Sequence, residues 1–289
     1  MEKTLNVALV QQACTADKQE NLQHSLAGIK EAAAGGAQLV VLPELHTTPY
    51  FCVTQRNDNF DLAEPVPGPT CETLARAAHE HRVVIIGSVF ERRAAGVYHN
   101  TAVVFDRDGS LAGKYRKMHI PDDPGYNEKF YFTPGDLGFT PIKTSLATLG
   151  VLVCWDQWFP EAARLMAIAG AELLIYPTAI GRNPDDSTAE QATQLDAWIT
   201  IQRAHAIANG LPLISCNRVG NETDGGDTFW GNSFVCGAQG EILARSDDQP
   251  AVLNATIDLQ ASEKVRRSWP FLRDRRIDAY SAILQRLTE

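Results

Sequence analysis

The sequence predicts a single α/β domain in the form of a four-layer α-β-β-α sandwich with two pseudo-two-fold halves. First, short apolar runs alternate with longer helix-like segments, as they do in α/β folds. Second, the segment Gly35–Pro43 is echoed by Ala169–Pro177, which indicates an internal repeat. Third, Val83–Ile86 is apolar at every position, as in a strand that is covered on both faces.

The first half is expected to contain two helices among three strands, followed by a hairpin. The hairpin turns at Asp108-Gly109, a strong short-range turn signal. In chain order the expected elements are the strand Leu5–Gln12, the helix Lys18–Ala34, the strand Gln38–Leu42, the helix Thr70–His81, the strand Val83–Glu91 and the hairpin Val97–Lys117.

The second half is expected to repeat this order. Asn100–Val103 in the first hairpin is echoed by Asn232–Val235, which begins the second hairpin. If each half forms a mixed sheet with helices on one face, the two bare sheet faces bury each other and four layers result. The expected elements are the strand Leu149–Val153, the helix Glu161–Ala169, the strand Glu172–Tyr176, the helix Gln191–Asn209 and the strand Pro212–Val219, before the hairpin.

Composition narrows the class of protein. With 289 residues and 44% hydrophobic residues, the chain can bury a large core as one domain over residues 1–289. No apolar run approaches the ~18 residues of a membrane span, and no apolar leader precedes the first strand, so a soluble cytoplasmic protein is expected. The net charge of −9 argues against nucleic acid as a partner and is compatible with a cationic substrate.

Cysteine and histidine spacing indicates no metal site. The six cysteines include no Cys-x-x-Cys pair, so neither a zinc site nor a disulfide framework is expected. The seven histidines form no cluster with metal-ligand spacing. We therefore expect neither a metal nor another cofactor.

Three reactive side chains stand at the ends of strand-like segments. Cys154 ends the apolar run Leu149–Val153, Glu44 follows the second expected strand, and Lys117 closes the first hairpin. A thiol at a strand end, where the backbone turns, can be presented as a nucleophile. A lone cysteine more often fills a core, but a carboxylate and an ammonium at equivalent positions favour a catalytic role.

These segments resemble the signatures of the nitrilase superfamily of carbon-nitrogen hydrolases. The matching segments are Leu42–Leu45, Arg116–His119 and Val153–Asp156, and the resemblance covers nearly the whole chain. It implies the four-layer fold already predicted from the repeat. Within the superfamily, Cys154–Arg164 and His119–Asp136 are similar to the N-carbamoylputrescine amidases.

The resemblance implies a role for each catalytic residue. Cys154 is the expected nucleophile and Glu44 the expected general base. Lys117 is expected to stabilise the oxyanion together with a backbone N–H group, that of Trp155. Glu128 falls where relatives carry a second acid that positions the substrate or the lysine. Its loop, residues 121–134, is expected to fold over the site.

The expected substrate is a small cationic carbamoyl-amine. Superfamily members that act on carbamoyl amino acids tend to place an arginine soon after the nucleophile, but Asp156–Trp158 follows here. Acids and aromatic residues near the signatures could instead bind an ammonium and a methylene chain, although each acid could cap a turn or helix and each aromatic residue could belong to the core. The candidates are Asp122, Asp123 and Glu161, with Tyr50, Tyr126, Trp155 and Trp158, and also Phe51 and Phe130.

The resemblance therefore implies hydrolysis of N-carbamoylputrescine to putrescine, ammonia and carbon dioxide through a covalent thioenzyme, in polyamine biosynthesis. The alternative is a related ω-amidase or a carbamoyl-amine or ureidopropionate hydrolase. His119 and His205 leave a Cys-His peptidase as a rival, but no such signature surrounds Cys154. A binding protein without activity is disfavoured because all three reactive groups are present.

The C-terminal tail, from about residue 258 to residue 289, is expected at a subunit interface. Aromatic residues alternate with arginines in Arg266–Arg273, and this is the composition of interface anchors. We therefore expect a homo-oligomer, a dimer or larger.

Overall fold

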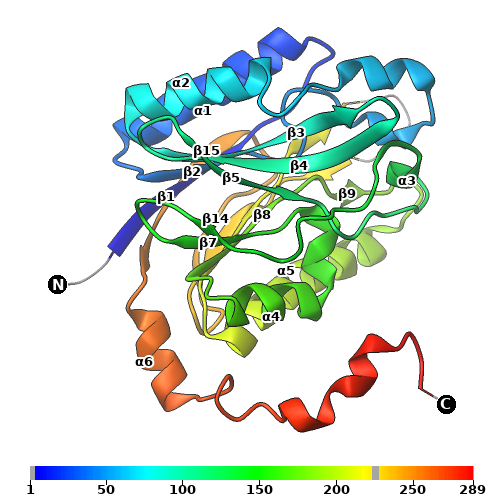
Figure 1. Cartoon of the computed structure of the whole chain (residues 1–289). Helices are drawn as coiled ribbons and strands as arrows, with labels where there is room; N and C mark the ends of the chain where they lie inside the picture. Colours follow the sequence, from blue (N-terminus) through cyan, green and yellow to red (C-terminus); the bar gives the residue numbers. More distant parts are fainter. Residues whose placement is uncertain (1–3, 223–227, 289) are drawn as a thin grey trace.

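A computed structural model describes residues 4–222 and 228–288, and its two halves each form a layered α/β unit (Figure 1). Within the described residues, five strands of the first half and one late strand form a six-stranded sheet in the order β15-β1-β2-β3-β4-β5. Its elements are β1 (Thr4–Gln11), α1 (Lys18–Ala34), β2 (Leu39–Val41), α2 (Pro69–His81), β3 (Val84–Ala94), β4 (Val97–Phe105), β5 (Leu111–Arg116) and the late strand β15 (Ala251–Asp258).

The second half supplies another six-stranded sheet within the described residues, in the order β14-β13-β10-β8-β7-β6. Its elements are β6 (Ile142–Lys143), β7 (Thr148–Val151), α4 (Pro160–Ile168), β8 (Leu173–Pro177), α5 (Thr188–Asn209), β10 (Leu213–Cys216), β13 (Phe234–Cys236) and β14 (Ile242–Arg245). A small sheet joins β9 (Gly181–Arg182), β11 (Val219–Asn221) and β12 (Thr228–Trp230). The short helix α3 (Glu128–Tyr131) and the late helix α6 (Ala261–Ser268) complete the helices discussed below.

The two sheets have matching topologies, which confirms the predicted fold class. In the first sheet, parallel strands β1, β2 and β3 are followed by the antiparallel pair β4 and β5. In the second, parallel strands β7, β8 and β10 are followed by the antiparallel pair β13 and β14. The internal repeat of the sequence is therefore a repeat of strand order.

Alternating burial along the strands explains the four layers. In β3, Val84 and Ile86 belong to a core shared with Leu149 and Leu173 of the other sheet. Ile85, between them, belongs to a second core that includes Leu74 of α2. Successive side chains of a strand point to opposite faces, so β3 packs against a sheet on one face and helices on the other. Figure 1 shows α1 and α2 outside one sheet, and α4 and α5 outside the other.

Local signals determine where the principal helices begin and end. The side chain of Asp17 caps α1 by accepting hydrogen bonds from the N–H groups of Gln19 and Glu20. Ser187 and Glu190 form a capping box at the start of α5, which ends at Gly210 with a positive φ of 56°. In the described part of the chain, no helix has the length and apolarity required to cross a bilayer.

Several elements differ from the sequence-based expectation; α5 begins at Thr188 rather than Gln191, and the short elements β6, β9, β12, α3 and α6 were not predicted. β15 was not predicted, because it lies beyond the internal repeat and pairs antiparallel with β1 only at the sheet edge. The expected strand Pro212–Val219 is interrupted after Cys216, since the N–H group of Asn217 bonds to Ser233 Oγ, 2.9 Å away, and the chain then enters β11. The interruption places Arg218 between the two sheet segments.

Candidate active site

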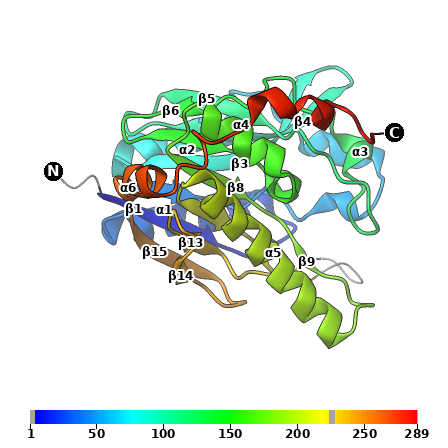
Figure 2. The same ribbon diagram turned by 90° about the horizontal axis from the view of Figure 1, so that it is seen from below.

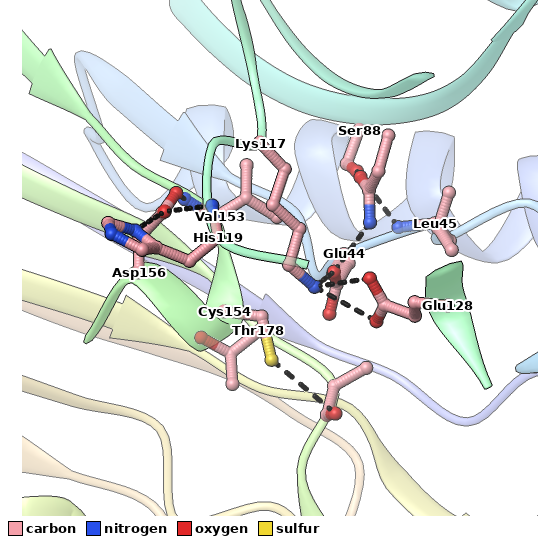
Figure 3. A network of polar contacts seen from close by, with 12 residues as sticks. Glu44, Leu45, Ser88, Lys117, His119, Glu128, Val153, Cys154, Asp156 and Thr178 are labelled. Carbon is pink, nitrogen blue, oxygen red and sulfur yellow. Dashed lines mark hydrogen bonds and ion pairs between the residues drawn. The ribbon is translucent and has the colours of Figure 1, made fainter. Parts of the chain in front are cut away.

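The three reactive residues predicted from strand ends converge where the two halves meet (Figure 3). Glu44 lies in the turn after β2, Lys117 directly follows β5, and Cys154 follows β7 at the start of a 3-10 helix, Cys154–Trp158. The Glu44 N–H group donates to the carbonyl of Thr178, 3.3 Å away, at the end of β8 in the other half. A backbone contact between the halves thus helps to hold Glu44 near Cys154.

The backbone at Cys154 adopts a conformation that is unfavourable for a residue with a side chain. Its φ is +41°, in the left-handed region, and its thiol contacts the carbonyl of Ala179 at 3.6 Å. Asp156 stabilises this bend, because its carboxylate accepts from the N–H groups of Val153 at 2.9 Å and His119 at 3.0 Å. The bend directs the thiol away from the strand and into the site.

Lys117 is the centre of the polar network. Its ammonium lies 2.7 Å from Glu44 Oε1, and 2.9 and 2.7 Å from the two oxygens of Glu128. The side chains of Lys117 and Glu44 are 0% exposed, and that of Glu128 is 1% exposed. Asn100 donates to Glu44 Oε1 at 2.6 Å, and the Tyr50 hydroxyl donates to Glu128 Oε1 at 2.6 Å. Each carboxylate is therefore held by a cation and a neutral donor.

Burial and neighbouring charges determine the protonation states. Burial raises the pKa of the Cys154 thiol well above its usual value; Glu44 and Glu128 add to this, and Lys117 opposes it. Burial alone would lower the pKa of Lys117, but Glu128 and Glu44 outweigh it and the pKa lies well above normal. The resting site therefore holds a neutral thiol and an ammonium, so attack by Cys154 requires a base. Glu44 Oε2 is buried and has no hydrogen-bond partner among the described residues, so this oxygen is available to accept a proton.

Cys154 opens into a cavity of about 340 Å³. The predicted binding residues Asp123, Tyr126, Trp155 and Trp158 line it. Asp186, Gln194 and Trp230 also line it and were not predicted. Among the described residues that form its wall, two are acidic and none is basic.

Five predicted binding residues lie elsewhere; one of them is Phe130, whose ring packs against that of Phe60 with centroids 5.7 Å apart. Tyr50 is buried beside Glu128, to which its hydroxyl donates a hydrogen bond. Asp122 is exposed and does not line the cavity. Glu161 lines a separate cavity with Phe271 and Tyr280 of the tail, because Pro160 begins α4 and the helix leads the chain away from Cys154.

The residues missed by sequence reasoning come from segments remote from the signatures. Asp186 precedes α5 and accepts from Gln194 Nε2 at 2.8 Å. A capping-box pattern at Ser187 and Glu190 marks the true start of that helix and could have drawn attention to this turn. Trp230 lies at the end of β12, and no spacing pattern associates it with Cys154. Phe51 belongs to a different aromatic cluster, packed against Phe90.

The two histidines of the peptidase alternative have other partners. His119 Nδ1 lies 2.7 Å from Asp156 Oδ1, and His205 Nε2 lies 2.8 Å from the carbonyl of Gln157. Figure 3 shows His119 and Asp156 apart from the group formed by Glu44, Lys117 and Glu128. Across residues 4–222 and 228–288, no group of three or more His, Cys, Asp or Glu side chains could hold a metal ion.

Comparison with known proteins supports the interpretation of this geometry. A family model described as carbon-nitrogen hydrolase matches residues 6–267. An N-carbamoylputrescine amidase from Oryza sativa subsp. japonica is 45% identical over 288 residues, covering 97% of this chain and 94% of the relative. A citrullinase from Francisella tularensis is 40% identical over 286 residues, covering 98% of this chain and 99% of the relative.

Solved structures agree with these matches. The crystal structure of a carbon-nitrogen hydrolase from Helicobacter pylori G27 superposes with a TM-score of 0.97 at 52% identity, covering 99% of this chain and 100% of the other. A point mutant of an amidase from Nesterenkonia sp. AN1 superposes with a TM-score of 0.77 at 25% identity, covering 96% of each chain. That structure shows covalent addition of the acetamide moiety of fluoroacetamide at the active-site cysteine.

Glu128→Gln should remove a pH dependence of stability. Burial raises the pKa of Glu128 from 4.5 to about 7, so between these two pH values the folded protein holds a proton there that the unfolded chain has lost. This contribution to stability is full below about pH 4.5 and is lost as the pH rises towards 7. The wild type should therefore lose unfolding free energy relative to Glu128→Gln across this window. Urea unfolding of both proteins at several pH values measures the difference, and a constant difference would contradict the raised pKa.

Proposed function

The chain belongs to the carbon-nitrogen hydrolase family of the nitrilase superfamily and is a cysteine-dependent C–N hydrolase, and we propose that its substrate is N-carbamoylputrescine. The observation that carries this proposal is the charge of the cavity wall. Asp123 and Asp186 line it, and no basic side chain among the described residues does. A substrate with a distal ammonium fits such a cavity, whereas a carboxylate would be repelled.

The proposed reaction begins with attack by Cys154 on the carbonyl carbon of the ureido group. The thiol proton passes to Glu44 as the sulfur–carbon bond forms. The ammonium of Lys117 and the backbone N–H group of Trp155, at the start of a 3-10 helix, stabilise the tetrahedral oxyanion. The carbon–nitrogen bond to the diamine then breaks, and Glu44 returns the proton to the leaving amine. Putrescine departs, and a carbamoyl group remains on the sulfur.

Water completes the cycle. Glu44 takes a proton from a water molecule as the oxygen attacks the carbamoyl-thioenzyme carbonyl, and the proton returns to the sulfur as the carbon–sulfur bond breaks. The product, carbamic acid, decomposes to ammonia and carbon dioxide. Glu128 contributes by orienting Lys117, since both of its oxygens bond to the ammonium at 2.9 and 2.7 Å. It is a positioning residue in this mechanism.

The cavity offers separate surfaces to the substrate chain and to its charge. Trp155, Trp158 and Trp230 supply apolar and aromatic area against which four methylene groups can pack. Aromatic faces also attract a nearby ammonium. Asp123 and Asp186 contribute acidic side chains to the same cavity. We therefore place the substrate ammonium against these acids, with the ureido group at Cys154.

Citrulline is the alternative substrate, because a relative named citrullinase is 40% identical to this chain. Citrulline carries the same ureido group but adds a carboxylate beside its distal amine. The two acids of the cavity would repel that carboxylate. A related ω-amidase or ureidopropionate hydrolase would likewise bind an anionic chain end, so the same argument disfavours both.

Cys154→Ala should abolish ammonia release while the protein stays folded. The change removes the proposed nucleophile and deletes one small group at the edge of the core. Circular dichroism should match that of the wild type. Cys236→Ala is the matched control, because Cys236 is also buried but lies in β13 and takes no part in the mechanism. Turnover by folded Cys154→Ala would contradict the covalent mechanism.

A substrate series should separate recognition of charge from recognition of shape. N-Carbamoylputrescine should exceed N-carbamoyl-β-alanine and citrulline by at least ~100-fold in kcat/KM, the scale of a partly desolvated ion pair gained and a repulsion avoided. N-Butylurea keeps the ureido group and the four-carbon chain but lacks the ammonium, so it should be a poor substrate. Asp123→Asn and Asp186→Asn should lower kcat/KM for N-carbamoylputrescine without lowering it for N-butylurea. Equal cleavage of the charged and neutral compounds by the wild type would exclude a role for the acids.

We also propose that a second copy of the chain covers the C-terminal tail. After α6 the tail runs along the outside of the body below α4 and α5 (Figures 1 and 2). Its apolar side chains are strongly exposed; Leu284 is 90% and Leu287 86% accessible, and Trp269 and Ile283 are also exposed. Apolar surface of this kind marks an interaction site, and its arginines and aromatic residues are typical interface anchors.

Truncation after Ser268 should dissociate the oligomer. The full-length protein should be a dimer or larger by light scattering at micromolar concentration. The truncated protein should contain fewer chains per particle, because it lacks the apolar tail. Leu111→Ala is a suitable control, since Leu111 is an exposed leucine on β5, outside the tail. A monomeric full-length protein, or a truncated protein of unchanged assembly, would contradict the proposal.

A further inference from the structure

Arg218 and Glu222 form a completely buried ion pair that the catalytic mechanism does not use. Arg218 Nη1 lies 2.6 Å from Glu222 Oε2, and the two side chains are 0% and 2% exposed. Both residues follow the interruption after β10, in the second half of the chain. Their partners, however, lie in the turn that carries Glu44 in the first half.

The guanidinium of Arg218 binds three carbonyl oxygens of this turn. Nη2 donates to the carbonyls of Glu44 at 2.7 Å, Leu45 at 2.8 Å and Thr48 at 3.2 Å. Leu45 has a positive φ of 49°, so the backbone turns sharply directly after Glu44. Such a turn leaves several buried carbonyls without partners in a sheet or helix, and a planar group with five N–H donors can satisfy them together.

Glu222 connects the ion pair, through Tyr50, to Glu128, the second carboxylate beside Lys117. Its Oε2 accepts from the N–H group of Tyr50 at 2.7 Å, and the Tyr50 hydroxyl donates to Glu128 Oε1 at 2.6 Å. The ring of Phe229 packs against Tyr50, with ring centroids 5.7 Å apart, and also lies 5.3 Å from the Arg218 guanidinium carbon. The ion pair thus contacts the backbone on both sides of the segment Glu44–Tyr50.

We propose that Arg218 and Glu222 are positioning residues that hold Glu44 in the geometry required for proton transfer. The inference rests on the proposed role of Glu44 as general base. The side chain of Glu44 is oriented by Lys117 and Asn100, but its backbone is held by Arg218 from the opposite half. Displacement of a catalytic group by about 1 Å can cost ~100-fold in rate, so the effect of losing this support should appear in kcat.

A double-mutant cycle with Arg218→Lys and Glu44→Gln tests the proposal. Lysine keeps the charge but lacks the planar fork that reaches several carbonyls at once. Arg218→Lys should lower kcat for N-carbamoylputrescine by about 10- to 100-fold with little change in KM. Glu44→Gln should lower kcat by ~10²- to 10⁴-fold. If Arg218 acts through Glu44, adding Arg218→Lys to Glu44→Gln should reduce kcat little further.

Two further variants keep the result interpretable. Arg203→Lys is the matched control, since Arg203 also donates to a backbone carbonyl, that of Gly240 at 2.6 Å, but outside the catalytic network. It should leave kcat unchanged. Glu222→Gln keeps an oxygen acceptor for both Arg218 and Tyr50. It replaces Arg218→Lys in the double-mutant cycle if Arg218→Lys fails to fold. It should show a smaller loss in kcat with the same non-additivity.

The outcomes separate the inference from the proposed function. If Glu44→Gln retains wild-type kcat, the assignment of the general base is wrong. A second outcome is that Glu44→Gln is impaired, but that a substitution at Arg218 or Glu222 lowers kcat by the same factor in the wild type and in Glu44→Gln. The two effects would then be independent, and the positioning role would be overturned. An unchanged kcat in folded Arg218→Lys and Glu222→Gln would also overturn it.

Discussion

The ammonium group of Lys117 is completely buried between the carboxylates of Glu44 and Glu128, and the organisation of the site depends on this ion triad. An isolated charge in a protein interior is strongly destabilising, so each member requires the others. The requirement brings together the turn after β2, the end of β5 and the start of α3. The triad also keeps the lysine protonated beside a neutral thiol, which is the starting state that the proposed mechanism needs.

The pseudo-two-fold architecture explains how a nucleophile from the second half reaches this triad. In the matching strand orders β2 corresponds to β8, and β8 pairs in parallel with β7, the strand that precedes Cys154. Two contacts across the join between the halves hold the turn that carries Glu44. The Glu44 N–H group bonds to the carbonyl of Thr178, and Arg218 binds the carbonyl of Glu44. The proposed mechanism therefore depends on backbone contacts between the halves as well as on the reactive side chains.

The sequence predicted the features that are encoded locally. The repeat Gly35–Pro43 and Ala169–Pro177 predicted the paired sheets, and strand ends predicted Glu44, Lys117 and Cys154 as one site. Asp123 and Trp158 were found because they lie within a few residues of the signatures. Sequence proximity was a poor guide for Glu161, because α4 carries it into another cavity. Tertiary packing brings Asp186, Trp230 and Arg218 to the site, and no spacing in the local sequence predicts their positions.

The central claim is that Cys154 carries the carbamoyl group during turnover. Rapid acid quenching of the wild-type enzyme with N-carbamoylputrescine, followed by mass spectrometry of its peptides, tests this most directly. The peptide containing Cys154 should gain the mass of one carbamoyl group, and peptides containing the other cysteines should remain unmodified. Turnover with no carbamoyl adduct at any time after mixing, or an adduct on another residue, would contradict this claim.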